Sequence, residues 1–252
     1  MWRKRKKLFK KLRISNKEKF TKEYIDMSIE KNLKKIRVQI PENVQLVCVS
    51  KFQPNKAILE AYHLGERIFG ESRVQELCEK QKSLPGDIQW HFIGHLQTNK
   101  VKYIVPFVDL IHAVDSLRLL EEIDRNARKI GRVVRCLLEI HIARESSKFG
   151  FLPEQLIEML KGEGWKNLHN VQICGLMGMA TYTDNQTQIR QEFRNLKLLY
   201  DQLKDSFFSN EASFRELSIG MSNDFQIAIE EGSTIVRLGT CIFGERNCTV
   251  IT

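Results

Sequence analysis

A lysine at the end of a buried segment is the residue of this sequence with the clearest chemical potential. Lys51 directly follows the apolar run Leu46–Ser50. An amine that is partly withdrawn from water has a lowered pKa and becomes a nucleophile, which can condense with an aldehyde to form a Schiff base. A lysine in this position is more commonly a solvated cap of a strand, so the amine alone does not define a site.

Two segments near the C-terminus have the composition of a phosphate-binding surface. Residues 218–224 read SIGMSND and precede a predicted helix, and residues 237–240 read RLGT. Small residues, hydroxyls and backbone N–H groups at helix starts suit a phosphate dianion. The alternative is a pair of ordinary turns in which Ser222 or Asn223 caps the following helix. Together with Lys51, the two segments favour a phosphorylated aldehyde as the ligand.

The histidines and cysteines do not form a recognisable metal site. His91 and His95 have the spacing of a helical metal pair, but they span the end of a predicted strand and have no acidic partner at ligand spacing. The six cysteines include no C-x-x-C pair, and Cys48, Cys136 and Cys174 lie inside apolar runs. We therefore expect no metal, and buried free thiols in a reducing compartment.

The order of the predicted elements would bring Lys51 and the two C-terminal segments together. Short apolar runs predict eight strands, at 45–50, 67–70, 88–94, 110–114, 133–142, 171–180, 215–220 and 235–238. Helical patterns lie between them, at 55–64, 74–84, 116–130, 153–161, 187–204 and 224–231, with a weak one at 98–105. A further amphipathic helix is expected before the first strand, because apolar residues recur at helical spacing from Phe20 to Ile36.

Eight strands that alternate with helices in 252 residues predict an α/β fold, a single (β/α)8 TIM barrel. The strand sequences VQLVCVS and VQICGLMGMA are continuously apolar, as in a parallel sheet that is covered on both faces. An open doubly wound sheet is the alternative, but no G-x-G-x-x-G motif follows the first strand. In a barrel, Lys51 and both small-residue segments would lie at the C-terminal ends of the strands, where active sites form.

The positive charge of the chain is confined to its N-terminal segment. The net charge is +9, but residues 1–37 hold fifteen basic and four acidic residues, which leaves the remainder slightly acidic. We expect residues 1–15 to be a flexible basic extension and residues 16–252 to form the barrel with its extra N-terminal helix. The alternative, contact with nucleic acid or anionic lipid, lacks the interleaved aromatic residues of a nucleic-acid surface. Without a long apolar run or a secretory signal, a cytoplasmic protein with no membrane segment is expected.

Eight stretches of the sequence, in order, resemble the YggS/PROSC family of pyridoxal phosphate homeostasis proteins. They lie within residues 20–246 and read LVCVSKFQP, FGESRVQEL, WHFIGHLQTNK, IHAVDSLRLLEEID, ESSKFGF, GLMGMATYTD, LSIGMSNDF and EEGSTIVRLGTCIFGER. The resemblance implies a fold-type III barrel like the N-terminal domain of alanine racemase. It also implies that pyridoxal 5'-phosphate (PLP) is joined to Lys51 as a Schiff base.

The same resemblance assigns the other cofactor contacts to the last two strands and their loops. It implies Ser222, Gly239 and Thr240 at the phosphate, Met221 and Gly220 in the loop beside it, and Arg237 at the pyridine nitrogen. An arginine keeps the ring close to neutral, which makes it a poorer electron sink than an aspartate would. The family usually has asparagine where this chain has Ser72, so no cofactor role is carried over to that position.

The resemblance implies a protein that binds, buffers or delivers PLP to PLP-requiring apoenzymes and has no dedicated turnover. The alternative is a fold-type III enzyme such as an amino-acid racemase or decarboxylase. A racemase of this fold needs two opposed bases, and in alanine racemases the second comes from an added β-domain of the partner subunit. This sequence ends at Thr252, shortly after its last predicted strand, so we expect a monomeric carrier without catalytic residues.

Overall fold

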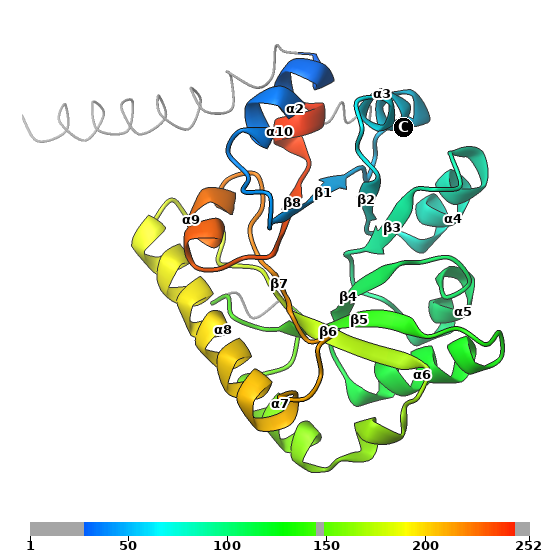
Figure 1. Ribbon diagram of the computed structural model, residues 1–252, viewed down its shortest axis with the longest axis vertical. Coiled ribbons are helices and arrows are strands. Elements are labelled where there is room, and N and C mark those ends of the chain that lie inside the picture. The colour runs from blue at the N-terminus through cyan, green and yellow to red at the C-terminus, as the bar shows by residue number, and fades with distance from the viewer. Residues whose placement is uncertain (1–27, 145–148, 245–252) are drawn as a thin grey trace, which may run out of the picture.

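The computed structural model describes residues 28–144 and 149–244, and they form a closed barrel of eight parallel strands (Figure 1). Each strand pairs with its neighbours in chain order, and β8 returns to pair with β1. The strands are Gln45–Val49 (β1), Ile68–Glu71 (β2), Gln89–Phe92 (β3), Leu110–Val114 (β4), Val134–Ile140 (β5), Val171–Gly178 (β6), Glu216–Ser218 (β7) and Ile235–Leu238 (β8). The (β/α)8 barrel is therefore confirmed, and the open sheet is excluded.

Helices alternate with the strands and cover the outside of the barrel (Figure 1). They are Ile29–Arg37 (α2), Asn55–His63 (α3), Val74–Ser83 (α4), Val101–Ile104 (α5), Leu117–Arg128 (α6), Pro153–Lys161 (α7), Gln186–Phe207 (α8), Phe225–Glu230 (α9) and Thr240–Phe243 (α10). The weak segment 98–105 is a 3-10 turn followed by the single turn of α5. The earlier part of the predicted N-terminal helix lies outside the described residues. Even α8, the longest described helix, lacks an apolar stretch of membrane-spanning length.

Two helices begin at residues whose side chains favour a helix start. Ser116 caps α6 by accepting a hydrogen bond from the N–H of Leu119, at 3.3 Å. Pro153 is the first residue of α7, where its missing N–H costs nothing. The helix α10 was not predicted; it packs beside α2 (Figure 1), and the Asn32 side chain donates to the carbonyl of Ile242 at 3.0 Å.

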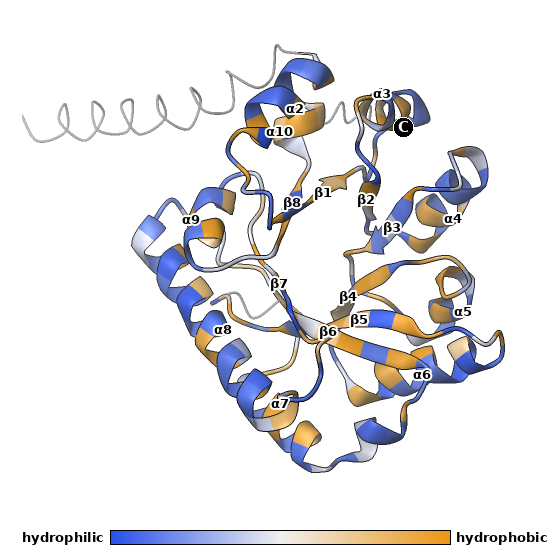
Figure 2. Ribbon diagram, in the orientation of Figure 1, coloured by the Kyte–Doolittle hydropathy of each residue, from blue (hydrophilic) through white to orange (hydrophobic). Residues whose placement is uncertain are grey.

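Apolar side chains form two layers. The larger layer lies between the strands and the surrounding helices, and the smaller one lies inside the barrel. The inner layer contains Val47, Leu110, Ala113, Leu137, Cys174, Met177 and Ile235. Figure 2 shows hydrophilic positions within the otherwise hydrophobic strands β5 and β6. The strands also bury polar side chains, among them His91, His112, Ser218 and Arg237, and these residues bear on function below.

The register between β5 and β6 shifts by one residue near the middle of the two strands. Cys136 pairs with Ile173, but Leu137 pairs with Gly175, so β6 has one extra residue at a bulge. Gly175 has a φ of +148°, and a Cβ on it would overlap the carbonyl oxygen of Glu216 in β7. Only glycine fits this position, where the bulge sets which side chains of β6 face the lumen.

Candidate cofactor site

Lys51 lies in the turn directly after β1, at the C-terminal rim of the barrel. Because Cys48 in β1 pairs with Leu238 in β8, both strands reach the rim side by side. The contact is close: a Cβ on Gly239 would stand 3.2 Å from the carbonyl oxygen of Val49. The structure thus places the predicted nucleophile next to the predicted loop after β8.

The residue before Lys51 is fixed by a buried ion pair. Lys80 Nζ, on α4, donates to the carbonyl oxygen of Ser50 at 2.8 Å and to Glu71 Oε1 at 2.7 Å. The Ser50 hydroxyl donates to the same Glu71 oxygen at 2.6 Å. Burial raises the pKa of Glu71, and the ammonium of Lys80 opposes that rise. Both polar groups of Ser50 are therefore tied to a rigid cluster in the wall of the barrel.

The residue after Lys51 is held by the same helix. The N–H of Phe52 donates to Glu76 Oε1 at 2.6 Å, and that oxygen also accepts from Lys80 at 2.7 Å. Phe52 has a φ of +65°, which is unfavourable for an aromatic residue, so the turn needs such support. Arg73 lies over the Phe52 ring at 4.6 Å. We call Ser50, Glu71, Glu76 and Lys80 the turn clamp, because together they hold both neighbours of Lys51.

Ser222 joins the loops that follow β7 and β8. Its Oγ accepts a hydrogen bond from the N–H of Gly239 at 3.3 Å, and the thiol of Cys241 donates to it at 3.3 Å. The two predicted phosphate-binding segments are therefore in direct contact. The Cys241 thiol is buried, and burial raises its pKa to about 11.

The helix after β7 begins at Phe225, one residue later than predicted. Asp224, and neither Ser222 nor Asn223, is the N-cap of α9, and its carboxylate accepts from the N–H of Met221 at 2.6 Å. Gly220 has a φ of +94°, and a Cβ on it would come within 2.6 Å of the Ala228 side chain. The loop thus turns sharply at glycine, and its serine is left to face Gly239.

Three backbone N–H groups in these loops donate to no hydrogen-bond acceptor among residues 28–144 and 149–244. They belong to Ser222, Asn223 and Thr240. Backbone N–H groups that have no acceptor in the described chain, together with the hydroxyls of Ser222 and Thr240, can donate hydrogen bonds to the oxygen atoms of an anion. The residues present therefore fit a phosphate group beside Lys51.

Arg237 is buried below these loops, with 4% of its surface exposed. Its Nη1 donates to the carbonyl oxygen and the hydroxyl of Ser218, at 2.7 and 2.6 Å, and its Nη2 donates to the carbonyl oxygen of Gly178 at 3.1 Å. Burial lowers the pKa of Arg237 to about 10, while the carboxyl groups of Asp224 and Glu139 oppose this. The guanidinium stays charged at neutral pH.

Glu139 is a site-facing carboxyl group that the sequence did not single out. It lies near the end of β5 with 3% of its surface exposed. Burial raises its pKa to about 7, the nearby carboxylate of Asp115 adds to the rise, and Arg237 opposes it. The only sequence signal is an acid within the apolar strand run VRCLLEI, where it needs a special environment.

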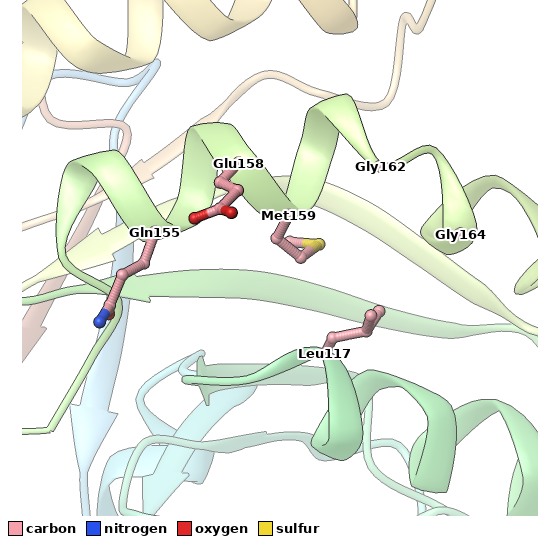
Figure 3. Close-up of a pocket in the computed structure, with 6 residues that line it drawn as sticks. All are labelled: Leu117, Gln155, Glu158, Met159, Gly162 and Gly164. Atoms are coloured by element: carbon pink, nitrogen blue, oxygen red, sulfur yellow. The ribbon is translucent and has the colours of Figure 1, made fainter.

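Two hollows of the surface lie away from the loops that contain Ser222 and Gly239. One of about 350 Å³ lies on the outer helical layer, between the start of α6 and α7 (Figure 3). It is lined by Leu117, Gln155, Glu158, Met159, Gly162 and Gly164. The other, of about 410 Å³, lies between the turn at Phe52 and α4, and its lining includes Glu76 and Glu79. Neither is lined by Ser222, Gly239 or Thr240, the residues predicted to bind phosphate.

The remaining residues with metal or redox chemistry do not form a second centre. Within residues 28–144 and 149–244, no three His, Cys, Asp or Glu side chains are arranged to hold a metal ion. The five described cysteines are free thiols, and all but Cys78 are buried. Cys248 lies outside the described residues. His95 pairs with Asp115 at 3.1 Å and stacks on Phe149, so it does not act with His91.

The sequence matches the alanine racemase N-terminal domain family over residues 26–247. A pyridoxal phosphate homeostasis protein from Aquifex aeolicus is 43% identical over 203 residues, which is 80% of this chain and 87% of the relative. A protein of the same name from Pasteurella multocida is 35% identical over 236 residues, which is 88% of this chain and 99% of the relative.

Solved structures give the same grouping. PipY from Synechococcus elongatus, in a structure with PLP bound, is 38% identical and superimposes with a TM-score of 0.78 over 86% of this chain and 100% of PipY. Its structure without PLP gives a TM-score of 0.81. An alanine racemase from Clostridium difficile gives 0.71 at 14% identity over 86% of this chain and 60% of its own, a likeness in fold alone.

Proposed function

Because the chain belongs to the family of pyridoxal phosphate homeostasis proteins, built on the alanine racemase N-terminal barrel, we propose that it binds PLP at the C-terminal rim and buffers or delivers it. One observation carries this proposal. The Lys51 turn lies beside two loops that Ser222 and Gly239 join, and these loops present N–H groups without another acceptor in the described chain.

Each group of rim residues has a separate task in this proposal. Lys51 supplies the amine, and an aldehyde that condenses with it forms a Schiff base with loss of water. The phosphate is held by Ser222, Gly239 and Thr240, in a loop that Gly220 and Met221 shape. Arg237 faces the ring from the wall of the barrel. The turn clamp keeps the backbone on both sides of Lys51 in place, so that the amine is presented at a fixed position.

We propose a carrier without dedicated turnover as the form of this function that the relatives and the site favour. The relatives at 43% and 35% identity are named homeostasis proteins. The alanine racemase shares only the fold at 14% identity, so it lends no support to racemisation. The guanidinium of Arg237 is a weak proton donor, which limits the electron withdrawal that a racemase or decarboxylase requires. The recipients would be apoenzymes that require PLP.

The decisive experiment is reduction of the PLP-loaded protein with borohydride, followed by peptide mapping. We expect an absorbance band of bound PLP and a reduced adduct on the peptide that contains Lys51. The variant Lys51→Ala should lose the adduct and keep the fold, whereas Lys56→Ala, an exposed lysine on α3, should behave as the unsubstituted protein. An adduct that persists in Lys51→Ala, or an unsubstituted protein that never acquires the band, would contradict the proposal.

A further inference from the structure

A line of buried polar side chains runs through the barrel from Arg237. The guanidinium donates to Ser218 Oγ at 2.6 Å, and His112 Nδ1 lies 2.9 Å from the same oxygen. His112 Nε2 lies 3.0 Å from His91 Nδ1, and His91 Nε2 lies 3.4 Å from Asp109 Oδ2. We call Ser218, His112 and His91 the lumen chain. The lumen chain connects the guanidinium of Arg237 to the carboxylate of Asp109.

The lumen chain crosses the interior of the barrel. Ser218 is on β7 and His112 is on β4, and two strands, β5 and β6, lie between them along the shorter way around the barrel. Side chains on non-adjacent strands of a closed barrel can meet only inside it. All three members are at most 1% exposed. Asp109 directly precedes β4, so it lies at the end of the barrel opposite to Lys51.

The two ends of the line determine which way its hydrogen bonds run. A guanidinium only donates, so Ser218 Oγ accepts from Arg237 and turns its own proton towards His112 Nδ1. At the other end, the contact with His91 lowers the pKa of Asp109, which also accepts from Arg135 at 3.1 Å. This carboxylate only accepts, so His91 Nε2 carries a proton.

The middle of the line then has a single arrangement. Burial lowers the pKa of both His91 and His112, so both rings are neutral at pH 7 and each holds one proton. With His91 protonated on Nε2, its Nδ1 accepts from the Nε2–H of His112. Every contact then has one donor and one acceptor, and all donors point from Arg237 towards Asp109. The reverse order would require a second proton on His91.

This order constrains Arg237 at the site. Ser218 and Gly178 together accept from three of the five N–H donors of the guanidinium, which leaves two for other partners. Ser218 Oγ can serve as a dedicated acceptor because His112 takes its proton. If His112 could not accept, the hydroxyl would be free to rotate, and one contact of Arg237 would lose its fixed geometry.

We infer that Ser218, His112 and His91 are positioning residues that hold the guanidinium of Arg237 in one orientation towards the bound cofactor. They do so because the Asp109 carboxylate, which can only accept, fixes the direction of every hydrogen bond between it and Arg237. The inference rests on the proposed function in one respect, namely that Arg237 faces PLP. The hydrogen-bond order itself is a property of the protein without cofactor. The two parts are therefore tested separately.

The first test is nitrogen-15 NMR of the histidine rings in the cofactor-free protein. Single substitutions His91→Phe and His112→Phe assign the signals. We expect both rings in the unsubstituted protein to be neutral at pH 7 and protonated on Nε2. A ring that carries its proton on Nδ1, or that is cationic at this pH, would overturn the ordered line. This reading does not depend on whether PLP binds.

The second test is the absorbance spectrum of the PLP-loaded protein across pH. We expect His112→Phe and the smaller change Ser218→Ala to displace the absorbance maximum and its pH midpoint, while PLP affinity stays within about tenfold of its original value. The control Leu110→Val also removes atoms from the lumen, but it should lower the unfolding temperature without changing the spectrum.

The outcomes separate the inference from the proposed function. If the unsubstituted protein acquires the PLP band and both Ser218→Ala and His112→Phe keep its maximum and pH profile, the positioning role is wrong and the proposed function stands. If His112→Phe does not fold, the spectrum of Ser218→Ala alone tests the positioning role: an unchanged absorbance maximum and pH profile would overturn it. If the unsubstituted protein shows no band, the proposed function fails, and the role of Arg237 towards PLP fails with it.

Discussion

Replacement of Glu139 by glutamine should stabilise the cofactor-free protein, and by an amount that depends on pH. The carboxyl group lies almost completely buried near the end of β5, with Asp115 as a second carboxyl nearby and Arg237 as the opposing charge. Burial raises its pKa from 4.5 to about 7. The folded protein therefore keeps a proton that the unfolded chain releases between these two values. Glutamine has nearly the same shape as the protonated acid and never ionises.

The size of the effect follows from the shift and from linkage. A shift from 4.5 to about 7 corresponds to roughly 3 kcal/mol at pH 8, at about 1.4 kcal/mol per pKa unit. The folded state binds more protons than the unfolded state in this window, so the acid destabilises the fold increasingly as pH rises through it. At pH 5 the folded state is protonated and the penalty is below about 1 kcal/mol. Glu139→Gln should remove the whole pH-dependent part.

Thermal or urea unfolding of both proteins between pH 5 and pH 8 measures this difference. We expect Glu139→Gln to unfold at nearly the original temperature at pH 5 and roughly 6–12 °C higher at pH 8. The control Glu121→Gln changes an exposed carboxyl of α6 and should shift neither value. A difference between Glu139→Gln and the original protein that is constant across pH would refute the reasoning, because it would mean that Glu139 ionises in the fold as it does in the unfolded chain.

Three further predictions concern the turn clamp, the bulge and the N-terminal segment. Lys80→Met should destabilise the fold by about 3–5 kcal/mol in urea unfolding, because it leaves the buried carboxylate of Glu71 without its ion-pair partner. The control Lys82→Met changes an exposed lysine of α4 and should leave the stability unchanged. Equal unfolding midpoints for the two variants would contradict the role of the turn clamp. Gly175→Ala should yield little folded protein by circular dichroism, because its Cβ would overlap Glu216; a native melting curve would disprove the close approach. Removal of residues 1–13 should leave PLP affinity unchanged in a spectroscopic titration, and a lost band would show that the segment contributes to the site.

The fold was predictable because its signals are local and repeated. Each strand is a short apolar run, and most helices end at a glycine or begin at a proline or a capping residue. The rule that barrel sites form at the C-terminal ends of strands then placed Lys51 with the loops after the last two strands. In the structure, Gly239 lies against Val49, two residues before Lys51. Their roles towards the cofactor stay predictions.

The predicted ends of strands and helices were less accurate where the backbone conformation of a single residue sets the end of the element. The seventh strand was expected over 215–220, but β7 ends at Ser218, and Gly220 adopts a positive φ that no strand pattern announces. The alternative to a phosphate site placed the helix cap at Ser222 or Asn223, but Asp224 takes that position and leaves Ser222 for Gly239. The preference of Ser, Asn and Asp for caps does not distinguish three such residues in a row.

The lumen chain could not be predicted, because it depends on which side chains point inward. His112 lies within the apolar run LIHAV, which reads as a strand that is buried on both faces. Such a run does not reveal the inward residues, and they also depend on the register of β4 and β5, which shifts between Ile111 and Val114. The contact between His112 and Ser218 joins residues that are 106 positions apart. No spacing in the sequence signals a pair at such a separation.

Polar side chains inside a barrel do not in general stabilise it more than apolar side chains of similar volume would. Aliphatic side chains usually fill this space, and replacing buried charged groups by apolar residues of similar volume is often neutral or stabilising. This chain instead buries two imidazoles and a guanidinium there, and each of the two imidazoles is engaged at both nitrogens. Stability alone does not account for that choice. Under the inference drawn above, the ordered line holds the Arg237 guanidinium in one orientation, which gives these buried groups a role beyond stability.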